Sequence, residues 1–189
     1  KRPDCDYPFD ALAGVGVAFK LILALAIKNG LKTTDVFNQY VDIATLGTIA
    51  DVVPLLGENR VIVDKGLKIL HNPKRIGIRA IMEVAGVLDK PLNVSTIAFS
   101  IAPRLNAAGR LGSAATAVEL LLTNDESRAR ELALLLDTEN KERQQTERQI
   151  FDEALELIAK DPNFEKKKVI VLAQENWHQG VIGIVASRL

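Results

Sequence analysis

The chain has 189 residues, of which 48% are hydrophobic and 25% charged, and its 24 basic and 24 acidic side chains give a formal net charge of zero. These proportions are typical of globular domains and exclude a disordered tail, and no uncharged apolar run reaches the length of about 18 residues that spans a bilayer. The single cysteine, Cys5, excludes an internal disulfide and is compatible with a reducing compartment, so we expect a cytoplasmic protein without membrane attachment.

Helices are predicted over most of the chain. Apolar side chains occupy nearly every position of residues 10–28, which predicts a helix buried on most sides, and Asn29-Gly30 supplies its C-terminal stop. Further helices are expected over residues 34–49, 58–71, 75–86, 94–101 and 113–122. The breaks between them are expected where Pro, Gly or Asn cluster, at residues 54–57, 72–73 and 89–91, and at Pro103.

Residues 124–160 contain neither Gly nor Pro and predict one helix roughly 55 Å long. Its two ends are apolar on one face, whereas residues 137–149 contain no large apolar side chain. A helix that is polar all round is typical of a segment that crosses solvent, and a coiled coil would need unbroken heptads through this middle. The segment is therefore predicted to connect two lobes. It carries ten acidic and six basic side chains, a distribution that does not itself identify a ligand.

Beyond the long helix, the β-branched run 169–173 predicts a strand. After a polar loop, residues 180–189 are apolar except for Ser187-Arg188 near the end, which favours a helix packed on that strand. The order strand, loop, helix is the opening of an α/β domain.

Two aspartates lie in the apolar run of residues 42–55. Ionised carboxylates are costly to bury unless they are paired or bound to a metal. Asp42 and Asp51 could each cap a helix or turn, or Asp51 could be a metal ligand. On one helix the two would be separated by a rise of about 13 Å, which is too far to share an ion. We therefore predict that Asp42 is structural.

Four blocks of the sequence resemble segments of a known protein family. Residues 47–55, GTIADVVPL, resemble the fourth motif of the DHH phosphoesterases in the form found in the RecJ family. Residues 7–21, 102–111 and 177–189 are similar to further RecJ segments in the same order. The resemblance implies that Asp51 helps to hold divalent metal, Mn²⁺ or Mg²⁺, and hard cations of this kind prefer carboxylate ligands.

The Asp-x-Asp and Asp-His-His motifs of the family do not occur in this chain, and neither His71 nor His178 follows an aspartate. Of the metal cage, only Asp51 is expected here. We therefore expect an internal fragment that is mostly α. The resemblance divides it into the C-terminal part of an α/β DHH domain over residues 1–123, a connector helix over 124–160, and the first strand-helix unit of an α/β DHH-associated domain over 166–189.

The block at residues 102–111 contains two arginines, Arg104 and Arg110, on either side of the small residues 105–109, which we expect to form a turn. Such a turn lets the backbone approach a ligand, and guanidinium groups match phosphate oxygens. Alternatively, Pro103 ends a helix and both arginines are ordinary surface residues. The resemblance places this block near the DNA path, so we expect phosphate contacts, with Asn106 orienting an arginine or contacting a phosphate itself.

The last block adds four candidate residues. Trp177 and His178 lie in a polar loop, where they could stack on a base or contact a phosphate. Alternatively, Trp177 fills a gap between strand and helix and His178 is a surface residue. Ser187 and Arg188 match the Ser-Arg pair that the resemblance assigns to the pocket for the 5′-phosphate.

The resemblance implies a fragment of a metal-dependent 5′→3′ single-stranded-DNA exonuclease that releases 5′-mononucleotides in DNA repair and recombination. Its partner would be single-stranded DNA, and we expect a monomer. One alternative is another DHH phosphodiesterase that acts on short oligonucleotides or cyclic dinucleotides. Such enzymes usually read Asp-Thr-Gly at the fourth motif, whereas Val-Val-Pro follows Asp51 here. The other alternative is a non-catalytic helical interaction module.

Overall fold

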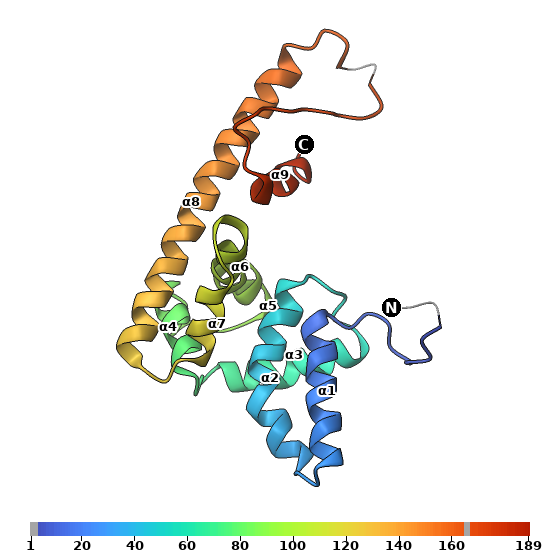
Figure 1. The fold of residues 1–189 in the computed structure, drawn as a ribbon, viewed down its shortest axis with the longest axis vertical. Helices are drawn as coiled ribbons and strands as arrows, with labels where there is room; N and C mark the ends of the chain where they lie inside the picture. The colour runs from blue at the N-terminus through green and yellow to red at the C-terminus, as the bar shows by residue number, and fades with distance from the viewer. Residues whose placement is uncertain (1–3, 165–166) are drawn as a thin grey trace.

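The computed structural model describes residues 4–164 and 167–189, and all regular secondary structure in these residues is helical (Figure 1). The elements are α1 (Gly14–Lys28), α2 (Thr33–Ala50), α3 (Gly57–Leu70), α4 (Ile76–Val84), α5 (Val94–Thr96), the π-helical η1 (Ile97–Ile101), α6 (Ala102–Leu111), α7 (Ala115–Leu122), α8 (Glu126–Ala159) and α9 (Gln179–Ala186). The helices expected from the sequence are present, with ends that differ by a few residues except after residue 101, where the helical backbone continues to Leu111. No helix of the described residues is long and apolar enough to cross a membrane.

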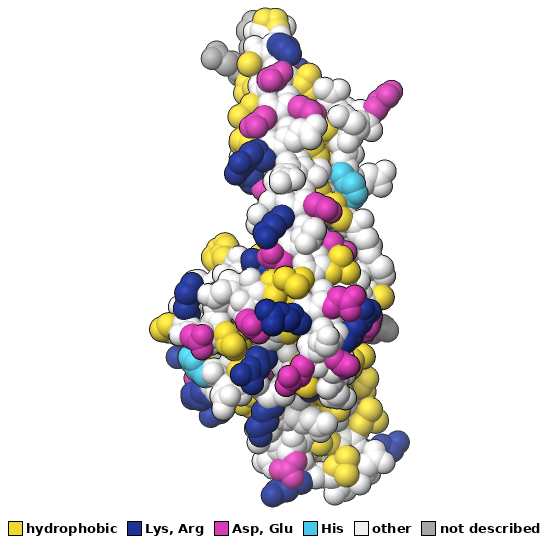
Figure 2. All heavy atoms as spheres, turned by 90° about the vertical axis from the view of Figure 1, so that its left-hand side faces the viewer, with side chains coloured by type: hydrophobic (Ala, Val, Ile, Leu, Met, Phe, Trp, Pro, Cys, Tyr) yellow, Lys and Arg dark blue, Asp and Glu magenta, His cyan; other side chains and the backbone are white. Residues whose placement is uncertain are grey.

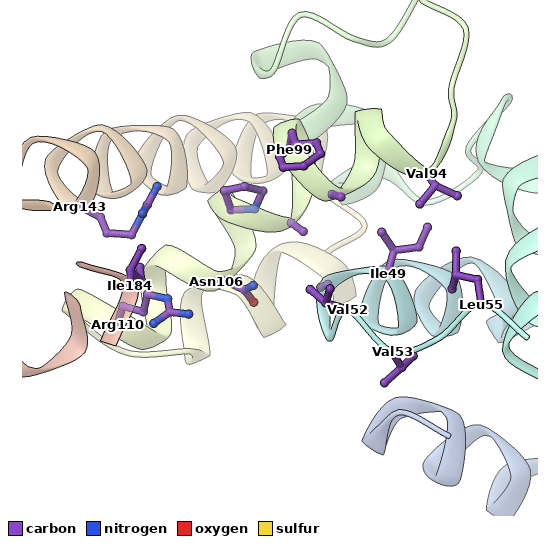
Figure 3. Close-up of a pocket in the computed structure, with 14 residues that line it drawn as sticks. Ile49, Val52, Val53, Leu55, Val94, Phe99, Asn106, Arg110, Arg143 and Ile184 are labelled. Atoms are coloured by element: carbon purple, nitrogen blue, oxygen red, sulfur yellow. The ribbon is translucent and has the colours of Figure 1, made fainter. Parts of the chain in front are cut away.

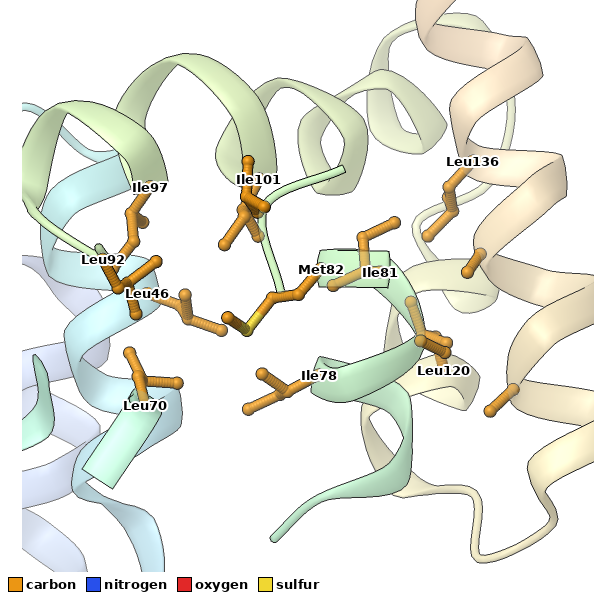
Figure 4. Packing of buried hydrophobic residues seen from close by; sticks show 14 of the residues in the cluster. Leu46, Leu70, Ile78, Ile81, Met82, Leu92, Ile97, Ile101, Leu120 and Leu136 are labelled. Carbon is orange, nitrogen blue, oxygen red and sulfur yellow. The ribbon is translucent and has the colours of Figure 1, made fainter. Parts of the chain in front are cut away.

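The main hydrophobic core surrounds α4 (Figure 4). Ile78, Ile81 and Met82 of α4 are almost completely buried, and side chains of α2, α3, η1, α7 and α8 surround them. Burying each such side chain contributes about 1.5 to 3 kcal/mol. Gly77 lets α4 approach α7, because a Cβ atom there would lie 1.7 Å from the carbonyl oxygen of Leu120. This core fixes the position of the helices that carry the candidate site.

The first helix is less buried than its composition predicts. Phe19 packs against Phe37 of α2, with ring centroids 5.2 Å apart. The opposite side of α1 exposes large apolar side chains: Val17, Leu21, Leu25 and Ile27. The expectation that this helix is buried on most sides is therefore wrong for the described residues, because α1 packs mainly against α2.

Pro103 does not end a helix, contrary to expectation. The backbone continues from α5 through η1 into α6, and the N–H of Ala102 donates to the carbonyl oxygen of Ile97, five residues earlier. Proline lacks an N–H and its ring clashes with the carbonyl four residues back. The wider π turn directly before Pro103 accommodates both the missing N–H and the bulk of the proline ring. Residues 105–109 are consequently part of α6 and not the predicted turn.

The long helix predicted over residues 124–160 is confirmed as α8, which is about 50 Å long. Its N-terminus is capped by Asp125, whose side chain accepts a hydrogen bond from the backbone N–H of Arg128. The expectation that its polar middle crosses solvent is wrong, because Asp137, Asn140 and Arg143 are buried. The middle packs against α6, and α9 lies beside the upper half of the helix (Figure 1). Asp137 pairs with Arg104 of α6, while Arg143 donates to Asn140 and Glu147 within α8, and these partners make the burial possible.

The segment 169–173 forms no strand in the described residues. Val169 and Val171 are largely exposed, whereas Leu172 packs against a small cluster formed by α8 and α9. A strand needs the backbone of a neighbour for its hydrogen bonds, and the described residues provide none. The helix expected after it is present as α9.

Candidate functional site

An open hollow of about 560 Å³ lies where the end of α2 meets the start of α1 and the end of α6. It is lined by Ala13, Gly14, Val15, Gly47, Ala50, Asp51, Asn106, Gly109 and Arg110. Three predicted site residues, Asp51, Asn106 and Arg110, therefore share one hollow although they come from two distant parts of the sequence. The α-helical conformation of α6 explains the pairing of the last two, because residues four apart lie on the same helix face.

Asp51 and Asp42 have opposite surroundings. Asp51 is exposed at the C-terminal end of α2, and within the described part of the chain its carboxylate makes no hydrogen bond or ion pair. Asp42 is buried and its Oδ2 lies 2.9 Å from Nε of Arg75. This ion pair agrees with the structural role predicted for Asp42. The Asp51 carboxylate remains available to a ligand.

The residue after Asp51 has a strained backbone. Val52 has a φ of +56°, and it is the only residue other than glycine with a positive φ in residues 4–164 and 167–189. A β-branched residue in this region costs on the order of 1 to 3 kcal/mol, and such strain is often found at functional sites. Its side chain is also 86% exposed, so burial does not offset the strain. The strain is therefore evidence for function next to Asp51.

The described residues can supply only part of a metal site. They contain no group of three or more His, Cys, Asp or Glu side chains that could hold an ion. The Asp51 carboxylate is a ligand of the type that Mg²⁺ and Mn²⁺ prefer. The described residues thus offer one carboxylate of this type at the hollow and do not by themselves assemble a complete metal site.

Arg104 does not line this hollow. Its Nε donates to Oδ1 of Asp137 at 2.8 Å, and its Nη1 donates to the carbonyl oxygen of Ser100 at 2.5 Å. The side chain is only 18% exposed. The two arginines of the block 102–111 therefore have different surroundings, with Arg104 holding α6 against α8 and Arg110 facing the hollow.

Arg110 joins two of the sequence blocks. Its Nη1 lies 3.2 Å from the carbonyl oxygen of Gly180, at the start of α9. A Cβ atom at Gly180 would lie 2.2 Å from the carbonyl oxygen of Arg110, so only glycine permits this approach. The contact brings α9, with the predicted residues of the last block, to the end of α6.

Ser187 and Arg188 lie at the end of α9. Ser187 Oγ donates to the carbonyl oxygen of Ile184 at 2.7 Å. Arg188 Nη1 donates to Oε1 of Glu147 at 2.6 Å, and the guanidinium carbon lies 4.5 Å from the centroid of the Phe151 ring. A guanidinium has five N–H donors, so a half-exposed Arg188 retains donors for a ligand.

Trp177 and His178 have structural partners. Trp177 Nε1 donates to Oε2 of Glu153 at 2.7 Å, and the half-buried ring packs on the cluster between α8 and α9. His178 is exposed, and its Nδ1 accepts a hydrogen bond from the backbone N–H of Gly180 and so caps α9. These positions agree with the structural alternative for both residues, while DNA contacts by them stay a prediction.

A second hollow, which the sequence did not reveal, also contains Asn106 and Arg110 (Figure 3). Its lining also includes Val52, Phe99 and Arg143, none of which was among the predicted site residues. The spacing Asn140-x-x-Arg143-x-x-x-Glu147, which places three polar groups on one helix face, is a signal that could have identified Arg143.

No family model matches the sequence. Curated single-stranded-DNA-specific exonucleases named RecJ do resemble it. The Bacillus subtilis protein is 43% identical over 189 residues, which are 100% of this chain and 23% of that protein. The Haemophilus influenzae protein is 44% identical over 194 residues, which cover 98% of this chain and 34% of that protein. The chain thus spans 23% and 34% of the length of these two relatives.

Solved structures give the same result. RecJ from Thermus thermophilus in complex with Mn²⁺ matches with a TM-score of 0.82 and 41% identity, over 98% of this chain and 26% of that one. An exonuclease RecJ bound to manganese matches with a TM-score of 0.83 and 39% identity, over 98% of this chain and 46% of that one. The chain belongs to the RecJ family and corresponds over nearly all its length to one segment of these longer proteins.

Proposed function

We propose that the protein containing this chain is a metal-dependent exonuclease that degrades single-stranded DNA from the 5′ end and releases 5′-mononucleotides, in DNA repair and recombination. One observation carries the proposal. The hollow between α2 and α6 combines the Asp51 carboxylate, which has no partner among the residues that the structure describes, with the exposed amide of Asn106 and the exposed guanidinium of Arg110. Hydrolysis of a phosphodiester needs a carboxylate for metal and donors for phosphate oxygens, and both are present.

Each residue has a distinct part in the proposal. Asp51 provides one carboxylate ligand to a divalent cation, Mn²⁺ or Mg²⁺. Such cations orient the substrate and stabilise charge on phosphate oxygens. Asn106 and Arg110 donate hydrogen bonds to a phosphate of the strand, because charge-assisted bonds from guanidinium are among the strongest in proteins. Ser187 and Arg188 hold the phosphate at the 5′ end.

We propose smaller contributions to DNA binding for Arg104, Trp177 and His178. Arg104 pairs with Asp137, so its contribution to DNA binding is through the placement of α6. Trp177 and His178 hold the loop before α9 and contact DNA only from the outer side of that loop. On the face of the molecule that looks onto α8, basic and acidic side chains are intermixed, so its described residues form no basic strip for a strand (Figure 2).

We also propose the organisation that the sequence suggests. Residues 1–123 would form the C-terminal part of a DHH domain, and residues 166–189 would form the start of a DHH-associated domain. Residues 124–160 would be the helix that connects the two domains. The single Cys5 supports a cytoplasmic location, and we propose a monomer. The names of the relatives do not favour the two alternatives, a phosphodiesterase for short or cyclic dinucleotides and a non-catalytic module.

The test is the variant Asp51→Ala in the full-length protein. Loss of the carboxylate should reduce the release of nucleotides from a 5′-phosphorylated single-stranded oligomer in Mn²⁺ by more than about 100-fold, on the order expected for a lost metal ligand or its support. Because Asp51 is exposed, the unfolding midpoint should not fall.

The matched control is Asp89→Ala, which removes an exposed carboxylate that does not line the hollow. It should retain full activity. Activity of Asp51→Ala within a few-fold of the unmodified protein would assign Asp51 a structural role and remove the basis of the proposal.

A further inference from the structure

The second hollow extends from Asn106 and Arg110 to the apolar residues at the end of α2. Figure 3 shows Arg143, Arg110 and Ile184 at one end, Asn106 and Val52 in the middle, and Ile49, Leu55 and Val94 at the other end. Its volume is about 480 Å³, and its wall is mostly apolar. Asn106 and Arg110 also line the hollow that contains Asp51, so the two hollows share a wall.

Two exposed apolar side chains border the second hollow. Phe99, in the π-helical η1, is 80% exposed, and Val52 is 86% exposed. Leaving a phenylalanine in water forgoes about 1.5 to 3 kcal/mol that burial would provide. Neighbouring exposed apolar groups at a hollow mark a binding surface more often than single ones do.

The other end of the hollow is basic. Arg110 is exposed, and Arg143 is 9% exposed. Arg143 donates to Oε2 of Glu147 at 2.6 Å and to Oδ1 of Asn140 at 3.2 Å, but its Nε has no partner in the described residues. A guanidinium at one end and an aromatic ring beside the middle of the hollow (Figure 3) fit the two parts of a nucleotide, phosphate and base.

We propose that this hollow binds one nucleobase of the single strand whose phosphate contacts Arg110, and that the base stacks on Phe99. The inference rests on the proposed function, because single-stranded DNA supplies the base. Stacking does not discriminate among bases, since every base has a π face. Phe99 therefore adds affinity without sequence preference, as degradation of any single strand requires.

The experiment compares two ligands of equal length and charge, an oligothymidylate and an abasic oligomer, by fluorescence anisotropy with the full-length protein in Ca²⁺ in place of Mn²⁺. Phe99→Leu keeps an apolar side chain but removes the ring. It should weaken binding of the oligothymidylate about tenfold, the scale of one stacked base, and leave binding of the abasic oligomer unchanged. Phe99→Tyr keeps an aromatic face and should bind both like the unmodified protein.

The control is Leu122→Ala, which removes an exposed apolar side chain at the end of α7 that lines neither hollow. It should change neither affinity. Unchanged binding of the oligothymidylate by Phe99→Leu, or equal weakening of both ligands, overturns the inference; equal weakening with a lower unfolding temperature assigns Phe99 to protein packing. Failure of the unmodified protein to bind either oligomer would instead overturn the proposed function, so the two results are distinguishable.

Discussion

At the scale of residues, the surroundings of a charged group decide what it can do. Asp42 is buried and forms an ion pair with Arg75. Asp51, at the end of the same helix, has no partner in the described residues and lies next to the strained Val52. The arginines divide in the same way. Arg104 is held by Asp137, while Arg110 and Arg188 each keep N–H donors that have no acceptor among the described residues.

Glu147 is the residue that joins two of these arginines. Its Oε2 accepts from Arg143 and its Oε1 accepts from Arg188, both at 2.6 Å, and its side chain is 14% exposed. The carboxylate therefore fixes the direction of the Arg188 guanidinium, which also lies over the ring of Phe151. We expect Glu147 to be a positioning residue for the end of the strand.

Glu147→Gln tests that role in the full-length protein. The amide offers one acceptor in place of two, so one of the two guanidinium groups loses its partner. The preference for 5′-phosphorylated over 5′-hydroxyl oligomers should fall about tenfold, equivalent to about 1.4 kcal/mol, with little change in binding of the 5′-hydroxyl oligomer. Titrations with the two oligomers measure it.

The control for this variant is Glu156→Gln on the same helix, where the carboxylate pairs with Lys160 in an exposed position. That variant should keep the end preference, since exposed pairs contribute little. A stronger preference for the phosphorylated end in Glu147→Gln would show that the carboxylate competes with the phosphate for Arg188, contrary to a positioning role.

At the scale of elements, the middle of α8 is held by ion pairs and not by apolar packing. Burial alone raises the pKa of the Asp137 carboxyl, but the hydrogen bond of Lys141 and the charge and hydrogen bond of Arg104 outweigh burial, so this pKa lies below its ordinary value of 3.8. The unfolded chain thus takes up the proton more readily than the folded one. Stability from Asp137 is present above pH 3.8 and is lost as the pH falls through the lower folded pKa.

Asp137→Asn should therefore destabilise the protein at pH 7 by about 3 kcal/mol, since it leaves Arg104 without its charged partner in a mostly buried position. The variant should also lose less stability than the unmodified protein on acidification to about pH 3. Urea unfolding at the two pH values measures both effects. Asp64→Asn, which breaks an exposed pair with Lys68, should cost much less stability, because exposed ion pairs are screened by water. Equal costs for the two variants would contradict a special role of the buried pair.

Local pattern was enough to predict the helices and the length of α8, because periodicity, capping and breaks are properties of neighbouring residues. It failed at Pro103, where a π turn removes the clash that should end a helix, and in the middle of α8, where Arg104 and Arg188 arrive from other helices. The sequence marked Asp51, Asn106 and Arg110 as candidates, but it could not show that these three lie together in one hollow. Contacts between α2 and α6 join Asp51 to Arg110 and separate both from Arg104.

At the scale of the whole molecule, the chain covers only part of its relatives, and its described residues offer one free carboxylate at the candidate site. A phosphodiesterase site with two metal ions needs several carboxylate or imidazole ligands around the ions. The exposed apolar face of α1 also indicates that the chain is only part of a larger structure, because this face lacks a packing partner within the described residues. The chain alone is therefore expected to lack the complete site.

The 189-residue chain by itself should consequently release no nucleotide from a 5′-phosphorylated single-stranded oligomer in Mn²⁺, because one carboxylate does not hold two cations against water. The measurement is product formation on a denaturing gel over hours, with the full-length protein as the positive control. The chain with Asp51→Ala identifies any contaminating nuclease, since a contaminant would act equally in both preparations. Manganese-dependent release that disappears in Asp51→Ala would contradict the prediction and would show that these residues alone assemble a working site.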